Sequence, residues 1–192
     1  MKIIVATSNP HKVQEIEQIA EIIGIKGIEF TPIPKSLKFD PVENGKTFEE
    51  NAIIKALEAN RLTGEITLAD DSGLCVEALN GGPGIYSARY AETPQQRINK
   101  LLENLKDKQN RKAKFVCAMV LVSKDGKVIF KCTGECKGKI TEKQSGLNGF
   151  GYDPVFFIEE SSKTMAEMPE IEKNKISHRS RALKQILDFL SK

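Results

Sequence analysis

The sequence predicts an α/β protein in which a mixed, twisted β-sheet is flanked by helices. Three observations lead to this fold class. An apolar segment over residues 2–6 is followed by segments with helical periodicity, as in a crossover between parallel strands. Residues 115–122 and 128–132 are apolar and flank an Asp-Gly pair at Asp125 and Gly126, which is typical of a hairpin. The chain closes with an amphipathic helix expected over residues 177–190.

The expected helices carry their own start and stop signals. A proline at position 10 predicts the start of the first helix, and Gly24 predicts its end. Residues 47–50 and 93–96 each match a capping box, in which a threonine and a later Glu or Gln satisfy the first backbone N–H groups. Both boxes precede apolar residues at helical spacing, so each opens a helix. A further strand is expected over residues 154–158.

The composition predicts one domain over residues 1–192, because this length allows a substantial hydrophobic core. The longest apolar run, residues 116–122, is far too short to span a bilayer, and the first residues lack a signal-peptide pattern. We therefore expect a cytoplasmic protein with no membrane partner. A net charge of +3 is too small to indicate a nucleic-acid groove, but it suits a small anionic ligand.

The four cysteines are expected to be reduced and structural. Cys75 and Cys117 fall inside apolar segments, where a thiol packs as a small hydrophobic group. Cys132 and Cys136 could in principle ligate zinc, but no second pair of Cys or His residues lies near them in the sequence. The cysteines therefore give little support to a metal site.

Asp70 and Asp71 follow the apolar residues 66–69 and precede Ser72. A buried strand cannot hold two unpaired carboxylates, so we expect both to emerge at the C-terminal edge of the strand, where open α/β sheets bind ligands. Their oxygens, together with those of Glu43 in the loop over residues 40–45, predict a site for one or two Mg²⁺ ions. A turn or helix cap is the structural alternative.

Three other segments carry groups suited to a nucleotide. Residues 7–12 place hydroxyls, an amide and a lysine at a helix N-terminus, which predicts a phosphate cradle, although a simple helix cap is the alternative. Residues 149–154 combine glycines with two aromatic rings that could stack on a base, or could instead form a tight turn. His178 and Arg179 at the start of the last helix indicate an anionic or carbonyl-bearing ligand.

Taken together, six motifs closely resemble the inosine triphosphate pyrophosphatase family. They lie at residues 7–12, 47–52, 70–74, 82–90, 149–154 and 177–179, and the resemblance runs in order from the first strand to the last helix. It implies an elongated α/β fold with two lobes around a central cleft, usually as a homodimer. It also implies Mg²⁺-dependent hydrolysis of non-standard purine nucleoside triphosphates (dITP/ITP, XTP/dXTP) to the monophosphate and pyrophosphate.

Carried over residue by residue, the resemblance assigns Asp71 as a metal ligand and the general base, and we expect Glu43 as the second metal contact. The roles of Asp70 and Asp71 stay open to exchange. Ser8 stands where the family more often has glycine, and Pro10 and His11 are this chain's own. The implied substrate-binding residues are Thr7, Ser8, Asn9, Pro10, His11, Lys12, Ser72, Phe150, Gly151, Tyr152, Asp153, Lys173, His178 and Arg179.

Three other functions compete with this interpretation. A Maf-type pyrophosphatase would keep the fold and change the base, but it lacks the combination of residues 150–153 with residues 177–179. A non-catalytic nucleotide-binding module has little use for an exposed carboxylate pair that repels triphosphate. A metal-dependent nuclease would need a basic groove, which the small net charge does not indicate.

Overall fold

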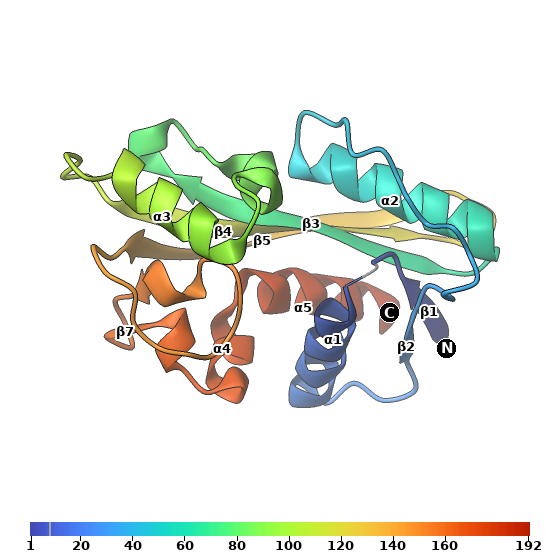
Figure 1. Cartoon of the computed structure of the whole chain (residues 1–192). Helices are drawn as coiled ribbons and strands as arrows, with labels where there is room; N and C mark the ends of the chain where they lie inside the picture. Colours follow the sequence, from blue (N-terminus) through green and yellow to red (C-terminus); the bar gives the residue numbers. More distant parts are fainter. Residues whose placement is uncertain (8) are drawn as a thin grey trace. The chain divides into compact units, whose positions relative to one another are not determined.

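The computed structural model of the chain describes residues 1–7 and 9–192, without the side chains of residues 10 and 11. Among these residues, seven strands form one sheet in the order β2-β1-β3-β4-β5-β6-β7 (Figure 1). β1 pairs in parallel with β2 and β3, whereas β6 pairs antiparallel with β5 and β7. The predicted mixed sheet is therefore confirmed. The strands are β1 (Lys2–Val5), β2 (Glu29–Pro32), β3 (Thr67–Val76), β4 (Lys112–Val122), β5 (Val128–Ile140), β6 (Phe156–Ile158) and β7 (Lys163–Thr164).

The helices of the described chain begin and end largely where the sequence signals lie. Gly24 follows the first helix with a left-handed φ of 82°, and Gly64 follows the second with a φ of 65°. The capping box at Thr93 is complete. The α-helices are α1 (Pro10–Ile23), α2 (Phe48–Thr63), α3 (Pro94–Asn104), α4 (Glu170–Ile176) and α5 (His178–Leu190), and the 3₁₀ helices are η1 (Glu77–Leu79), η2 (Gly84–Arg89), η3 (Asp153–Val155) and η4 (Met165–Glu167).

The capping box predicted at Thr47 is only half formed. The Thr47 hydroxyl accepts a hydrogen bond from the backbone N–H of Glu50 (3.1 Å), as predicted. The Glu50 carboxylate, however, accepts a hydrogen bond from the backbone N–H of Lys46 (2.6 Å), whereas a complete capping box would have it accept from the backbone N–H of Thr47. The helix still begins at Phe48, because one satisfied N–H and two first-turn carboxylates favour its N-terminus.

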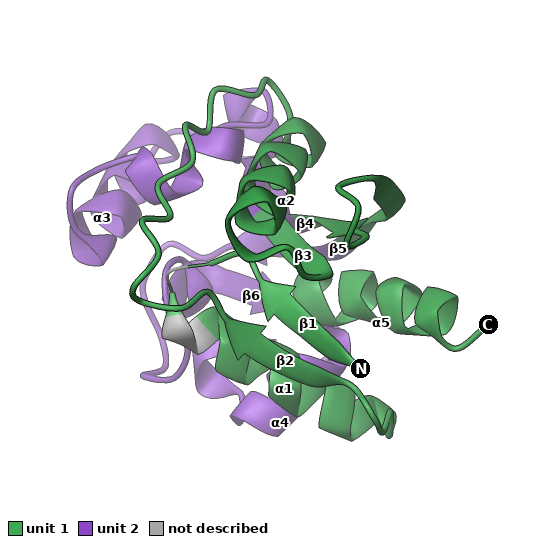
Figure 2. Cartoon of the chain, turned by 90° about the vertical axis from the view of Figure 1, so that its right-hand side faces the viewer, with its two compact units in different colours: residues 1–71, 117–134, 178–192 green, residues 72–116, 135–177 purple. Residues whose placement is uncertain are grey.

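The chain divides into two compact units, coloured separately in Figure 2. Unit 1 comprises Met1–Asp71, Cys117–Gly134 and His178–Lys192, and unit 2 comprises Ser72–Val116 and Glu135–Ser177. Three strands, β3, β4 and β5, contribute residues to both units, so neither unit is one continuous piece of sequence. The single domain over residues 1–192 stays a prediction.

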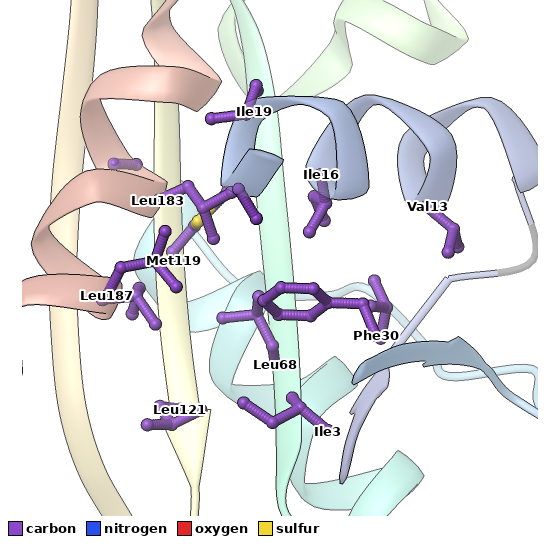
Figure 3. Packing of buried hydrophobic residues seen from close by; sticks show 14 of the residues in the cluster. Ile3, Val13, Ile16, Ile19, Phe30, Leu68, Met119, Leu121, Leu183 and Leu187 are labelled. Atoms are coloured by element: carbon purple, nitrogen blue, oxygen red, sulfur yellow. The ribbon is translucent and has the colours of Figure 1, made fainter. Parts of the chain in front are cut away.

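Unit 1 buries apolar side chains on both faces of its strands. Successive residues of a strand point to opposite faces, and accordingly Leu68 and Ala69 belong to different clusters. Leu68 packs with Ile16 of α1 and Phe30 of β2, and Figure 3 shows these side chains pointing toward one another. On the other face, Ala69 packs with an alanine stripe of α2 that includes Ala52. Helices thus cover both faces of the strands in this unit.

Unit 2 has a hydrophobic cluster of its own. Ile98, Leu101 and Leu105, from α3 and the residue after it, pack with Leu74 and Val76 of β3. These are three of the apolar residues that follow the capping box at residues 93–96, and a fourth, Leu102, is half-buried against the same cluster. The amphipathic pattern of α3 correctly predicted the face that packs.

The prediction that the aspartate pair lies at the C-terminal edge of its strand is wrong. β3 extends from Thr67 to Val76, so Asp70 and Asp71 lie inside the strand and not at its C-terminal edge, and the turn alternative fails as well. The strand continues because both carboxylates have cationic partners supplied by helices, which removes the penalty that an unpaired buried ion would impose.

Several short elements escaped prediction. β2 has four residues, β7 has two and α4 has seven, so each carries too little periodicity to be recognised. The strand expected over residues 154–158 begins only at Phe156, because Asp153–Val155 form η3, in which Pro154 has a fixed φ and no N–H. In the described part of the chain, every helix is too short or too polar to cross a membrane.

Candidate functional site

Asp70 lies at the centre of a buried ion-pair network in unit 1. Its Oδ1 accepts from Lys12 Nζ at 3.0 Å, and its Oδ2 accepts from Arg179 Nη2 at 3.1 Å. The second terminal nitrogen of Arg179 donates to Glu15 Oε2 at 2.6 Å. The side chains of Asp70 and Arg179 are each only 1% exposed, so this network ties α1, β3 and α5 together through buried charges.

Asp71 points to the opposite face of β3 and has different partners. Its Oδ1 accepts from Lys55 Nζ at 3.0 Å, and its Oδ2 accepts from Asn51 Nδ2 at 3.3 Å. Lys55 also donates to Glu43 Oε2 at 3.4 Å, so one ammonium joins two carboxylates. Asn51 in turn accepts from the backbone N–H of Gly45, which fixes the loop that carries Glu43 against α2.

The two neighbouring aspartates have opposite pKa shifts. Burial acts to raise the pKa of Asp70, but the charges of Lys12 and Arg179 outweigh it and hold that pKa well below its usual range. Burial also raises the pKa of Asp71, and there it prevails over the attraction of Lys55. The ion pairs of Asp70 therefore favour its ionised form, whereas Asp71 is the stronger base of the pair.

The turn before α1 was predicted to cradle phosphate. The Thr7 hydroxyl accepts from the backbone N–H of Asn9 at 3.0 Å, and the N–H of Lys12 donates to the Asn9 carbonyl at 3.2 Å. Lys12, predicted to pair with a phosphate oxygen, binds Asp70 here and keeps a side chain that is 19% exposed. Ser8 and the side chains of Pro10 and His11 lie outside the described residues.

The donor set around Asp71 fits a magnesium ion. Glu43 and Asp71 converge on a single cation, the Lys55 ammonium, so a cation is already accommodated between these two carboxylates. Among the described residues, no group of three or more His, Cys, Asp or Glu side chains could hold a metal ion. Magnesium does not require such a cage, because proteins commonly bind it through one or two carboxylates together with substrate phosphates and water.

Residues 149–153 of unit 2 form a loop organised by one carboxylate. Asp153 Oδ2 accepts from the backbone N–H of Phe150 at 2.9 Å and from Lys173 Nζ at 2.8 Å. The Lys173 ammonium lies 4.7 Å from the centre of the Phe150 ring, which is 47% exposed. A Cβ on Gly149 would collide with Asp153 Oδ2, so the glycine allows the carboxylate to reach the main chain.

Tyr152 and Phe150 have different environments within that loop. Tyr152 is buried, and its hydroxyl donates to the Ser87 carbonyl at 2.9 Å, so the tyrosine anchors the loop to unit 2. Phe150 is the exposed ring, and only that ring is accessible for stacking in the described conformation. One hollow of unit 2, about 1610 Å³ and lined by Cys75, Lys114 and Lys137 among others, includes none of the predicted site residues in its described lining.

Arg179 and His178 begin α5 in unit 1, and both are buried. Arg179 was predicted to face a purine, but its two terminal nitrogens are bound by Glu15 and Asp70, which makes it a support for Asp70 in this conformation. Gly134 of β5 lies directly against this helix start, where a Cβ would collide with the His178 carbonyl. Ser72, the first residue of unit 2, is half-buried on β3.

Three members of the site were missed by sequence reasoning: Lys55, Asn51 and Glu15. Lys55 and Asn51 are four residues apart on the buried face of α2, which also carries three alanines and Asn60, and polar residues among these alanines were the available signal. Glu15 sits among the apolar positions of α1 and is 4% exposed. A charged residue on a buried helix stripe predicts a partner, and here the partner is Arg179.

The fold and this site define an α/β protein in which one strand carries two adjacent buried aspartates, the second more basic than the first, each paired with a different lysine. The chain belongs to the Ham1 family, whose model matches residues 3–189. It is 42% identical over 185 residues to the dITP/XTP pyrophosphatase of Synechocystis sp., covering 96% of this chain and 93% of the relative. It is 43% identical over 196 residues to the dITP/XTP pyrophosphatase of Treponema denticola, covering 99% and 98% of the two chains.

Solved structures agree with this assignment. The Staphylococcus aureus Ham1 protein matches with a TM-score of 0.87 and 38% identity, covering 100% of this chain and 98% of the other. A HAM1 protein from Coxiella burnetii matches with the same TM-score and 40% identity, with the same coverage. The expected α/β fold class and the family resemblance are both confirmed.

Proposed function

We propose that this protein hydrolyses non-standard purine nucleoside triphosphates, dITP/ITP and XTP/dXTP, to the monophosphate and pyrophosphate. Relatives that are 42% and 43% identical over nearly the whole chain are named dITP/XTP pyrophosphatases, which supports this substrate class. The observation that carries the chemistry is the Asp71 carboxylate, buried and more basic than an ordinary aspartate, beside Glu43 and Lys55. A carboxylate of this kind suits a general base.

Asp71 takes the role of the base in the proposed reaction. Its carboxylate accepts a proton from a water molecule whose oxygen forms a new bond to the α-phosphorus. The bond between that phosphorus and the bridging oxygen to the β-phosphate breaks, and pyrophosphate leaves with the electron pair. Asp70 takes no proton, because Lys12 and Arg179 keep it ionised. This division of roles follows from the opposite pKa shifts of the two residues.

Glu43 and Asp71 would hold Mg²⁺ between them, in line with their shared position around one ammonium. When bound there, the ion would supply positive charge to offset the charge that develops on the phosphate oxygens. In the proposed site, residues 7–12 bind phosphate and Ser72 contacts the substrate. Phe150 stacks on the base, held in place by Asp153, and Lys173 and His178 donate to the base's 6-oxo group.

Quaternary structure and location follow the family resemblance. We propose a cytoplasmic homodimer that acts on the free nucleotide pool. Light scattering on the purified chain tests the dimer, which predicts twice the 21.3 kDa of one chain. A monomer at micromolar concentration would contradict it and would leave the hydrolytic proposal standing.

The hydrolytic activity is tested by following product release from ITP, dITP, XTP, GTP and ATP. Pyrophosphate and orthophosphate are measured separately, since release of pyrophosphate in a single step distinguishes this reaction from sequential phosphatase action. We expect pyrophosphate from ITP and XTP with Mg²⁺ and almost none in chelator. Orthophosphate as the first product, or full activity in chelator, would contradict the proposal.

A further inference from the structure

Lys55 occupies an unusual position, because its ammonium is enclosed by carboxylates that a metal ion would also need. The side chain is 8% exposed, and its Nζ lies 3.0 Å from Asp71 Oδ1 and 3.4 Å from Glu43 Oε2. Its stem rises from the face of α2 whose neighbouring positions, Ala52 and Ala56, are fully buried. Packing therefore aims this lysine at the two carboxylates.

The charges around Lys55 indicate what it does there. Within the ion pairs that the described residues form in this part of unit 1, the three cations Lys12, Lys55 and Arg179 face the four carboxylates of Glu15, Glu43, Asp70 and Asp71. Asp70 and Glu15 are already matched by Lys12 and Arg179. Among the side chains that the structure describes, Lys55 is therefore the one cation paired with Asp71 and Glu43, and its charge opposes any second cation that approaches the same oxygens.

We propose that Lys55 is a positioning residue that takes the place of the divalent cation in the metal-free protein. It holds Asp71 and Glu43 together, and it weakens cation binding until the ammonium gives up its contacts with those carboxylates. A triphosphate brings negative charge that offsets the opposing ammonium, so the cation binds best together with the nucleotide. This inference rests on the proposed function, since it concerns the same two carboxylates.

Binding of Mn²⁺ to the purified full chain without nucleotide tests the inference directly. The free ion is counted by its electron paramagnetic resonance signal, which does not depend on turnover. The variants are Lys55→Met, which removes the charge but keeps the length of the stem, and Lys55→Gln, which retains a donor for Asp71. The control is Lys131→Met, which removes an exposed lysine paired with Glu49.

We expect both Lys55 variants to bind Mn²⁺ between about 5- and 150-fold more tightly than the wild type, the usual range of coupling between two sites. Lys131→Met should bind as the wild type does. The thermal midpoint of Lys55→Met should fall in chelator and recover with Mn²⁺. If Lys55 contributes only packing, Lys55→Met would lower the thermal midpoint, and Mn²⁺ would not restore it.

Unchanged or weaker Mn²⁺ binding in both Lys55 variants would overturn the inference, as would no detectable Mn²⁺ binding in any variant. If Lys55→Met fails to fold, Lys55→Gln decides alone. The proposed function has its own readout in pyrophosphate release by the wild type. A wild type that releases pyrophosphate while the variants show no gain in affinity would refute the role of Lys55 and leave the hydrolytic activity intact.

Discussion

Asp70 and Asp71 are adjacent along β3, yet their carboxylates are bound from opposite faces of the strand by different lysines. Lys12 holds the first and Lys55 the second, each at 3.0 Å. The alternation of side chains along a strand separates the two residues into different environments. One aspartate can therefore stabilise the fold while its neighbour is available for chemistry.

Asp71→Asn should abolish nearly all turnover while the fold stays intact. The amide keeps the shape of the side chain but cannot accept the proton, and a general base is typically worth about 10²- to 10⁴-fold in rate. The measurement is kcat for ITP, with circular dichroism to verify folding. Glu49→Gln is the control, since Glu49 only pairs with Lys131 on the surface. Retention of more than about a tenth of wild-type turnover would refute the assignment of the base.

Asp70→Asn should lower stability far more than Asp71→Asn does. Removing the Asp70 charge takes away the carboxylate that pairs with both Lys12 and Arg179, while the pair between Arg179 and Glu15 stays. Breaking one side of a buried ion pair typically costs about 3–5 kcal/mol, and we expect the lower end because Glu15 remains. Urea denaturation of both variants measures the difference. Equal midpoints for the two variants would show that the Asp70 network does not stabilise unit 1.

Selectivity against adenine should depend on Lys173. Its ammonium can only donate hydrogen bonds, which suits a 6-oxo purine and meets the 6-amino group of adenine donor to donor. Unpaired polar groups in a site can reject the wrong ligand by about 10⁴-fold, so ATP should be a very poor substrate beside ITP. We expect the ITP:ATP ratio of kcat/KM to fall at least about tenfold in Lys173→Met.

Lys175→Met is the control for that experiment, because Lys175 lies on the same helix and is exposed. Arg179 is the less informative position for this test, since both of its terminal nitrogens are engaged by Glu15 and Asp70 and its loss would disturb unit 1. An unchanged ratio in Lys173→Met, or ATP turnover within about tenfold of ITP in the wild type, would show that Lys173 does not select the base.

Gly149→Ala should damage the Phe150 loop more than Gly151→Ala does. Both glycines have left-handed φ angles, 74° and 63°, so alanine strains each by about 1–3 kcal/mol. Only at Gly149 does the added Cβ collide with the Asp153 carboxylate, which would have to release Phe150 and Lys173. KM for ITP and the midpoint in urea measure both effects. Similar values for the two variants would mean that the Asp153 contacts do not organise the loop.

Cys132 should react slowly with alkylating reagents in the native protein. Burial raises the pKa of its thiol to about 11, and the thiol donates to the Ala182 carbonyl at 3.3 Å. Only the thiolate reacts, so at pH 8 alkylation by iodoacetamide should be about two orders of magnitude slower than for a free thiol. The rate should rise about tenfold per pH unit until the pKa is reached. Peptide mass spectrometry follows the label, and the urea-unfolded chain, which should react at the ordinary rate, is the control.

The parts of the fold that local signals specify were predictable from the sequence. Gly24 and Gly64 end helices, and the Asp125–Gly126 turn joins β4 to β5, because backbone conformation at these positions depends mainly on the residue itself. The position of the aspartate pair was not predictable in this way. Whether a strand can continue through two carboxylates depends on Lys12, Lys55 and Arg179, which are distant in sequence.

The candidate site was predictable in its residue types and less so in its contacts. Resemblance to a family pointed to Asp71 and Lys173, and the position of Glu43 in its loop suggested a metal contact, but neither gave a reason to expect Lys55 between Asp71 and Glu43. Lys55 belongs to a segment that reads as an ordinary amphipathic helix. Its contacts with Asp71 and Glu43 depend on how separate elements pack, which no local pattern encodes.

The discontinuous make-up of the two units has a consequence for how the chain folds as it is synthesised. In the larger hydrophobic cluster of unit 1, Ile3 and Ile16 pack with Leu183 and Leu187 of α5. The first two are synthesised early and the last two near the end of the chain. The ion pair between Asp70 and Arg179 likewise cannot form until α5 has been synthesised. A growing chain therefore exposes apolar surface and an incompletely neutralised carboxylate until residues 178–190 have emerged, and this is the interval in which we expect chaperones to bind it.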